Sequence, residues 1–137
     1  MKQVDLIIKR EYLQEILAGT KKEEYRSLSK FNTRLLCDNI DRASLIKGDH
    51  YIEHNKEVWR PKKNITHVRF LNGYRKDREY IICELKSINI DKFIKEIPDG
   101  MEPGTVCFTL ELGQIVEHNW QNLVDGKVLK PGAGGQS

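Results

Sequence analysis

The start of the chain combines one short strand pattern with one short helix pattern, and this order restricts the fold to a mixed α and β class. Val4 to Ile8 form an apolar, strand-like run, and in Glu11 to Ala18 the apolar residues recur at helical spacing. Gly19 follows, and glycine accepts the left-handed backbone conformation that ends many helices. We therefore expect a strand, a short helix and a stop at Gly19.

Further along, apolar and polar residues alternate in several short segments, which is the pattern of half-buried strands. The alternation covers residues 64–71, 80–90 and 105–112. Residues 115–120 form a last strand or continue the third segment past Gly113, where glycine permits a bulge. Short strands with little helix indicate an α+β protein, and we expect its sheet to close on itself so that no edge is exposed.

A second helix is expected near residue 30. Ser29 is a suitable N-cap because its side chain can accept a hydrogen bond from the first helical turn. The apolar residues that follow keep a helical period and predict a buried stripe: Phe31, Leu35, Leu36 and Ile40.

Three connections carry recognisable turn or loop residues. Residues 54–63 are polar and contain Pro61, so they predict an irregular connection or an exposed hairpin. Asn72 and Gly73 both tolerate positive φ and predict a turn. Residues 91–97 predict a short helix at most.

The composition is that of one globular domain with a charged surface. Of 137 residues, 39% are hydrophobic and 31% are charged, and we expect one domain over residues 1–130 with a flexible, Gly-rich tail over 131–137. No apolar run approaches the ~20 residues of a membrane helix. The three cysteines and four histidines are separated in the sequence, which favours buried thiols and hydrogen-bonding imidazoles over metal ligands. A cytoplasmic protein without membrane, metal or cofactor is expected.

Charge is distributed unevenly although the net charge is only +3. Residues 56–79 hold eight basic and three acidic residues, a balance of +5, and residues 80–125 hold three basic and eight acidic residues, a balance of −5. A single surface formed by the first block would suit phosphate-bearing partners such as RNA. Alternatively, basic and acidic side chains interleave in space and cancel.

The polar segment after Gly19 is the first candidate site. It contains Lys21, Lys22, Glu24 and Arg26 in a stretch that predicts an extended strand. Side chains two positions apart share one face of a strand, so Glu24 and Arg26 should point the same way, with Lys22 beside them. Arginine suits phosphate or carboxylate, and a carboxylate accepts from a base amine. The alternative is a structural ion pair between Glu24 and Arg26.

The pattern Gly-x-Lys-x-x-Glu-x-Arg over residues 19–26, after a strand and a helix, resembles the ASCH domain, a relative of the PUA fold. The segment His67 to Tyr74 is similar to a strand and turn of some bacterial and phage members. The resemblance implies a β-barrel of five to six mostly antiparallel strands with two N-terminal helices. It also implies that Lys21, Glu24 and Arg26 line a cleft between the first helix and the barrel, where RNA or a nucleoside-like ligand binds.

A second candidate site lies around residues 69–75. It includes Arg69, Asn72 and Tyr74. Tyr74 is expected to stack on a base and Arg69 to supply charge, because aromatic stacking beside positive charge is the usual way in which single strands are held. The alternative is a hairpin with a packed tyrosine and solvated arginines. Arg75 could contact a phosphate, or it could be a surface residue that contacts only water. Trp59 lies among basic residues and could contact RNA or anchor its own loop.

The resemblance also raises enzymatic alternatives. Some ASCH proteins are amidohydrolases that act on an acylated cytidine through a Thr nucleophile assisted by the motif Lys. Here Lys21 is present, but Glu24 stands at the Thr position, and a carboxylate does not replace a hydroxyl in acyl transfer. Other members are associated with RNA cleavage, for which Lys21 with Tyr25 or Tyr74 could supply the acid and the base. Glu24 could act as a base on water, so Lys21 and Glu24 are the catalytic candidates. We expect binding of RNA or a modified nucleoside, with a hydrolase or a protein-interaction module as alternatives.

Overall fold

The computed structural model describes residues 2–92, 102, 104–120, 123–124 and 127–128. The chain divides into two compact units: residues 1–22, 65–86 and 112–137 form the first unit, and residues 23–64 and 87–111 form the second. The tail expected over 131–137 lies outside the described residues. The short helix expected over 91–97 is wrong at residues 91 and 92, which belong to strand β7 (Tyr80–Lys92), and its remaining residues lie outside the described residues.

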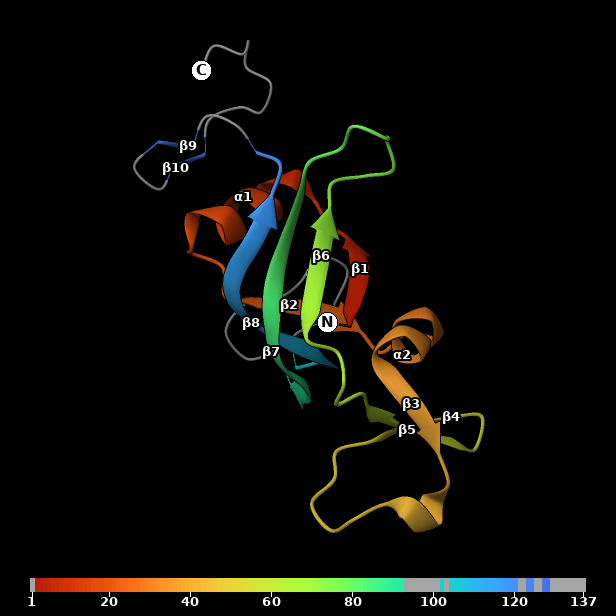
Figure 1. The fold of residues 1–137 in the computed structure, drawn as a ribbon. Helices are drawn as coiled ribbons and strands as arrows, with labels where there is room; N and C mark the ends of the chain where they lie inside the picture. The colour runs from red at the N-terminus through yellow and green to blue at the C-terminus, as the bar shows by residue number, and fades with distance from the viewer. Residues whose placement is uncertain (1, 93–101, 103, 121–122, 125–126, 129–137) are drawn as a thin grey trace. The chain divides into compact units, whose positions relative to one another are not determined.

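Alternation of strands and helices begins at the N-terminus (Figure 1). In the first unit, β1 (Gln3–Ile7) leads into α1 (Arg10–Ala18). The residues of α1 that face the core are Leu13, Ile16 and Leu17. Gly19 ends the helix with φ of 82°, and its N–H donates to the Ile16 carbonyl at 3.1 Å. The predicted helix and its glycine stop are confirmed.

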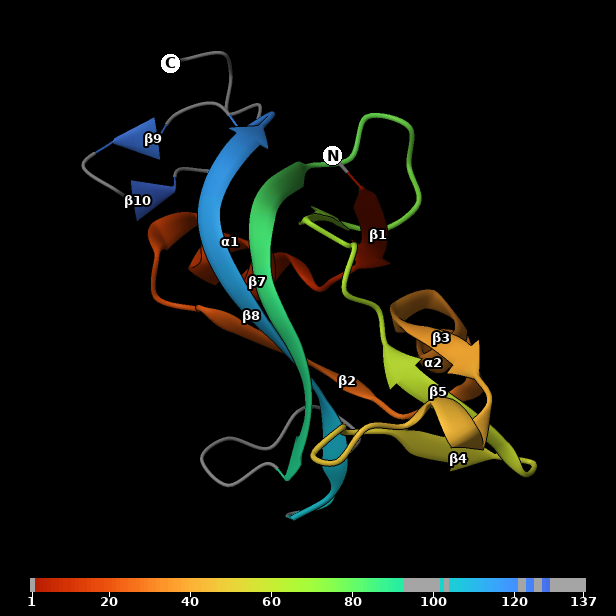
Figure 2. The same ribbon diagram turned by 60° about the horizontal axis from the view of Figure 1, so that its bottom comes forward.

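A mixed five-stranded sheet forms the framework, with hydrogen-bonded neighbours in the order β1-β6-β7-β8-β2. Its members after β1 are β6 (His67–Leu71), β7 (Tyr80–Lys92), β8 (Val106–His118) and β2 (Glu23–Ser27). β1 pairs in parallel with β6, whereas β6 with β7 and β2 with β8 are antiparallel. The long strands β7 and β8 run through both units (Figure 2).

This sheet is a half-barrel rather than the closed barrel that we expected. β1 and β2 are its edge strands, and the described residues contain no pairing that joins them. The two helices also alternate with strands instead of both preceding the sheet, because β2 separates α1 from α2. The expectation of a closed sheet depends on the number of strands, but the number of strands does not determine which strands pair with one another.

The second unit contains a small three-stranded sheet in the order β3-β5-β4. After α2 (Lys30–Leu36), the chain forms β3 (Cys37–Ile40), a short 3₁₀ helix (Arg42–Ser44), β4 (Ile52–His54) and β5 (Glu57–Pro61). In the first unit, a further antiparallel pair joins β9 (Leu123–Val124) to β10 (Lys127–Val128).

Helix α2 is shorter than predicted, and its buried face differs. The Ser29 cap is confirmed, since its hydroxyl accepts from the Asn32 N–H at 3.1 Å. The buried residues are Thr33 and Leu36, whereas Phe31 is 73% exposed. The predicted apolar stripe was wrong at Phe31, which faces solvent, and at Ile40, which belongs to β3 because the helix ends at Leu36.

The hairpin that was one of the two predicted alternatives for residues 54–63 is present and runs from Ile52 to Pro61, but it is not an exposed one, because β5 is the central strand of the small sheet and Val58 is buried. Between β4 and β5, Asn55 and Lys56 both have positive φ, 50° and 68°, as in the two-residue turns that match strand twist. Pro61 is the last residue of β5, and at the end of a strand the hydrogen bond that proline cannot donate is of little consequence for the sheet.

The predicted core positions of β7 and β8 are buried except at the start of β8, but the predicted alternation is interrupted, because Ile82 of β7 and Cys107 and Thr109 of β8 are buried as well. Ile81, Cys83 and Phe108 are fully buried, but Val106 is 37% exposed, at the beginning of its strand. β8 continues past Gly113 as one strand, which was the second of two predicted alternatives. All three cysteines are buried free thiols, as predicted. Among the described residues, no helix has the length and hydropathy needed to span a membrane.

Candidate nucleic-acid interface

The motif strand begins later than predicted, so that Lys21 and Lys22 precede it. Lys21 belongs to the cap of α1: its backbone N–H donates to the Glu15 carbonyl at 3.1 Å, and its ammonium lies 5.1 Å from the centre of the Tyr12 ring. Lys22 is exposed, and its carbonyl accepts from the Leu112 N–H at 2.9 Å.

Glu24 and Arg26 share one face of β2, as the strand spacing predicted. Arg26 donates to one oxygen of the Glu24 carboxylate through Nε at 2.9 Å and through Nη2 at 2.7 Å. The Glu24 residue is only 6% exposed. The ion pair considered as the structural alternative is therefore present, and the ligand-binding role of Lys21, Lys22, Glu24 and Arg26 stays a prediction. The two catalytic candidates, Lys21 and Glu24, belong to different units.

Arg69 is engaged within the protein. Its Nε and Nη2 donate to the two oxygens of Asp5 at 3.0 and 2.8 Å, across the parallel pair of β1 and β6. The hydrogen bond from Arg69 holds the pKa of Asp5 below its ordinary value, and the same bond raises the pKa of Arg69. Two parallel hydrogen bonds of this kind fix the planar guanidinium in place.

The loop between β6 and β7, residues 72–79, is held closed at its base. The backbone N–H of Asn72 donates to the Glu79 carbonyl at 3.0 Å, and the Asn72 side chain donates to the Glu79 carboxylate at 3.1 Å. Gly73 has φ of 78°, which confirms the predicted turn signal. The loop is longer than a two-residue turn, and a second turn forms where the Arg78 N–H donates to the Arg75 carbonyl at 3.2 Å.

Three residues that we did not predict support this loop. Glu79 is buried and also accepts from Arg10 of α1. Asn119 receives the Tyr80 N–H at 2.8 Å and donates to the Arg78 carbonyl at 2.9 Å. No sequence spacing relates Arg10, Glu79 and Asn119, because their contacts span 39 to 69 positions.

At the tip of the loop, Tyr74 is 84% exposed. Arg75 and Lys76 follow it and are also exposed. The loop extends beyond the ends of its two strands in Figure 1. A large aromatic ring beside two cations on a supported loop can stack on a nucleobase while the cations meet phosphates.

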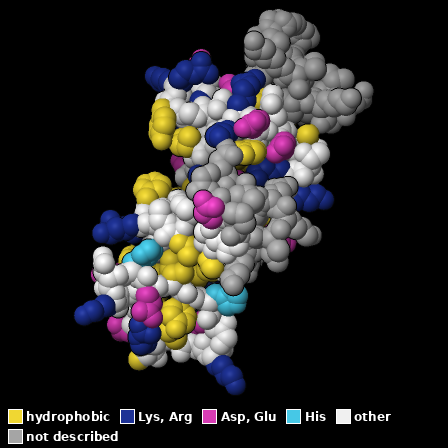
Figure 3. Space-filling view, turned by 180° about the vertical axis from the view of Figure 1, so that it is seen from behind, with side chains coloured by type: hydrophobic (Ala, Val, Ile, Leu, Met, Phe, Trp, Pro, Cys, Tyr) yellow, Lys and Arg dark blue, Asp and Glu magenta, His cyan; other side chains and the backbone are white. Residues whose placement is uncertain are grey.

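The basic block 56–79 does not behave as one unbroken positive patch. It is divided between the two units, and two of its arginines are paired with carboxylates, Arg60 with Asp49 at 3.0 Å and Arg69 with Asp5 at 2.8 Å. On the face drawn in Figure 3, basic and acidic side chains are interspersed. Arg75 and Lys76 are the exposed basic residues that adjoin Tyr74.

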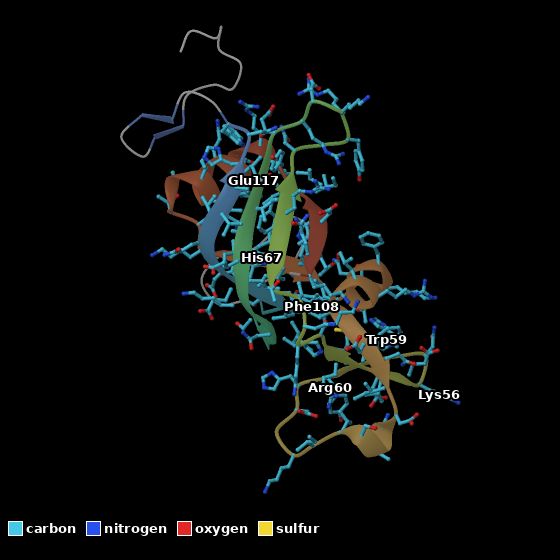
Figure 4. The ribbon with its side chains drawn as sticks, in the orientation of Figure 1. Lys56, Trp59, Arg60, His67, Phe108 and Glu117 are labelled. Atoms are coloured by element: carbon cyan, nitrogen blue, oxygen red, sulfur yellow. The ribbon has the colours of Figure 1, made fainter. Side chains whose placement is uncertain are left out.

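Three of the four histidines form hydrogen bonds, as predicted for residues that are not metal ligands. His54 contacts the Thr33 hydroxyl at 3.1 Å, and His67 contacts the Thr66 hydroxyl at 2.8 Å. His118 accepts from the Trp120 N–H at 3.1 Å. Figure 4 shows His67 on β6, among the strands of the sheet.

Comparisons with protein-family models, with curated proteins and with solved structures found no match to this chain.

Proposed function

We propose that this protein is an ASCH-like, single-stranded RNA-binding protein that stacks a base on Tyr74. The observation that carries the proposal is the 84% exposure of Tyr74 on a loop with a closed base. Stacking this ring on a base removes from water an apolar surface that the protein itself leaves exposed, and this burial favours binding. An arrangement in which the loop is fixed before binding also lowers the entropy lost on association.

The ASCH part of the proposal is supported by local structure. Helix α1 ends at Gly19 in a left-handed conformation, and the motif strand β2 follows within four residues and lies in a half-barrel sheet. RNA is the favoured ligand because the exposed residues Arg75 and Lys76 directly follow Tyr74 in the chain, and cations near a stacking platform are the common arrangement for single strands.

Binding of a fluorescently labelled single-stranded RNA, followed by anisotropy at two salt concentrations, tests the proposal. Tyr74→Ala should weaken binding about fivefold or more, because stacking on an aromatic residue contributes ~1–3 kcal/mol per base. Tyr74→Phe keeps the ring and should bind like the wild type. Tyr51→Ala is a matched control, since Tyr51 is also exposed, at 42%, but lies in the other unit.

Salt dependence provides a second readout. Replacing both Arg75 and Lys76 with alanine should reduce the slope of log affinity against log salt by about 1.4, since each phosphate contact with a single strand contributes ~0.7. Equal binding by Tyr74→Ala and the wild type would contradict the stacking role. Affinity independent of salt would contradict RNA and favour an uncharged nucleoside as the ligand.

A further inference from the structure

The second unit contains a small polar cavity between helix α2 and the β4–β5 hairpin. Its volume is about 60 Å³, and the residues that line it include Lys30, Thr33, Arg34, His54, Glu57 and Trp59. One water requires ~10–15 Å³ of such volume, so the cavity has room for a group of a few non-hydrogen atoms. All of these residues belong to the second unit. Figure 4 labels Trp59 on β5, with Lys56 at the turn of the hairpin.

Trp59, which lines this cavity, contains an unsatisfied hydrogen-bond donor. The indole N–H of Trp59 is buried and has no hydrogen-bond partner among the described residues. An indole N–H is a donor only, and a buried donor left unsatisfied costs ~1–3 kcal/mol. The Trp59 ring lines the cavity, so a ligand bound there would change the surroundings of this N–H.

Thr33 and His54 provide a second polar pair. The Thr33 hydroxyl lies 3.1 Å from Nε2 of His54, and the Thr33 residue is only 1% exposed. When Nε2 carries the proton, it donates to the hydroxyl oxygen, and the hydroxyl hydrogen is then available to a second acceptor.

The charges at the mouth favour an anion. Lys30 and Arg34 are four positions apart on α2, so they lie on the same side of the helix, and both are exposed. Glu57 is the acidic residue in the lining, and it too is exposed. Two cations and one carboxylate leave an excess of positive charge at the entrance.

The same two basic residues border a second, more open hollow of about 480 Å³. Its other lining residues are Phe31 and Leu35, which are apolar. Phe31 is 73% exposed, so α2 presents a large ring to solvent directly beside the cations. A ligand held by Lys30 and Arg34 could therefore place an anionic group in the polar cavity and an apolar group against Phe31.

We infer that this region binds a small ligand in which an oxyanion, phosphate or carboxylate, is attached to an aromatic or other apolar group. Lys30 and Arg34 neutralise the oxyanion, Trp59 lines the cavity that receives it, and Phe31 contacts the apolar group. This site does not depend on the RNA proposal, because Tyr74 and its loop belong to the first unit.

Phenyl phosphate and benzoate are suitable probes, and nuclear magnetic resonance of the ¹⁵N-labelled full-length protein is a suitable measurement. The protein has two tryptophans, so two indole N–H signals are expected, and Trp59→Phe assigns them. Either probe should shift the Trp59 indole signal in a saturable manner and leave the Trp120 signal unchanged. Which probe binds more tightly identifies phosphate or carboxylate as the preferred oxyanion.

Variants of the protein distinguish recognition of the anionic group from recognition of the apolar group. Arg34→Ala and Lys30→Ala should each weaken both probes about tenfold, whereas Lys47→Ala, an exposed lysine of the same unit outside the cavity, should change nothing. Phe31→Ala should weaken phenyl phosphate but not inorganic phosphate. Circular dichroism of each variant confirms that it is folded.

Three results would overturn the inference. The first is the absence of a saturable shift with both probes at millimolar concentration. The second is equal binding of phenol and phenyl phosphate, which would show that the anion is not recognised. The third is equal loss of affinity in Lys47→Ala and Arg34→Ala, which would show only a general attraction to positive charge.

Discussion

Gly113 of β8 lies so close to Glu84 of β7 that a Cβ atom at position 113 would stand 2.9 Å from the Glu84 Cβ. Real Cβ contacts are not this short, so any other residue at position 113 forces the two strands apart. The Glu84 carboxylate also accepts the Gln114 N–H at 3.0 Å, which ties the same two strands together. Glycine is required here by the neighbouring strand and not by its own backbone conformation.

We predict that Gly113→Ala destabilises the protein by about 1–3 kcal/mol, the usual cost of overpacking. Chemical denaturation measures the change in the free energy of unfolding. In a Glu84→Gly background the added cost of Gly113→Ala should be smaller, because the opposing Cβ is absent. The same cost in both backgrounds would show that the close approach is not the cause.

The buried ion pair of β2 predicts a stability effect at Arg26. Arg26→Ala leaves the Glu24 carboxylate, whose side chain is 8% exposed, without its guanidinium partner. We expect a loss of about 1.5–3 kcal/mol in the free energy of unfolding. Arg42→Ala is the matched control, since Arg42 pairs with Glu53 at the surface and should have little effect.

The same variant also tests the predicted ligand role of Arg26. RNA affinity is measured under conditions in which Arg26→Ala is fully folded. If Arg26 contacts the ligand, affinity falls although the protein is folded. If affinity is unchanged, the role of Arg26 is structural.

The Asp5–Arg69 contact predicts part of the acid sensitivity. Because the folded-state pKa of Asp5 is lowered from 3.8 by the hydrogen bond from Arg69, this contact stabilises the folded state fully above that pH. The stabilisation is lost as the pH falls through the lower, folded-state pKa. Asp5→Asn should therefore be less stable than the wild type at pH 7, and the difference should shrink below pH 3.8.

Urea denaturation at a series of pH values measures this difference. Arg69→Met removes the partner and should abolish the same part of the pH dependence in the wild-type background. A constant difference between Asp5→Asn and the wild type from pH 7 to pH 2 would show that the contact does not contribute to acid sensitivity.

The buried thiols should be unreactive in the folded protein. Burial raises the pKa of Cys37 and of Cys83 to about 12, so very little thiolate exists at pH 8. We expect slow modification by Ellman's reagent in the native state and fast modification in denaturant. Val116→Cys, at a position that is 52% exposed, should react rapidly in the native state and serves as the control. Equally fast reaction of the native wild type would contradict the burial of these residues.

Local features of this protein were determined by the sequence alone. The helix stop at Gly19, the Ser29 cap and the shared face of Glu24 and Arg26 each depend on residues within a few positions of one another. The physics of these features is local: backbone conformation, capping and the two-residue period of a strand. The same holds for the buried face of β7 at Ile81 and Cys83.

Only the tertiary structure decided the features that join distant segments. The parallel pairing of β1 with β6 links residues 64 positions apart. The support of the Tyr74 loop by Arg10, and the cavity that brings Thr33 beside His54, likewise depend on which segments pack together. Periodicity states which face of an element is apolar, but it does not state which partner covers that face. This is why Phe31 was predicted to be buried and is exposed.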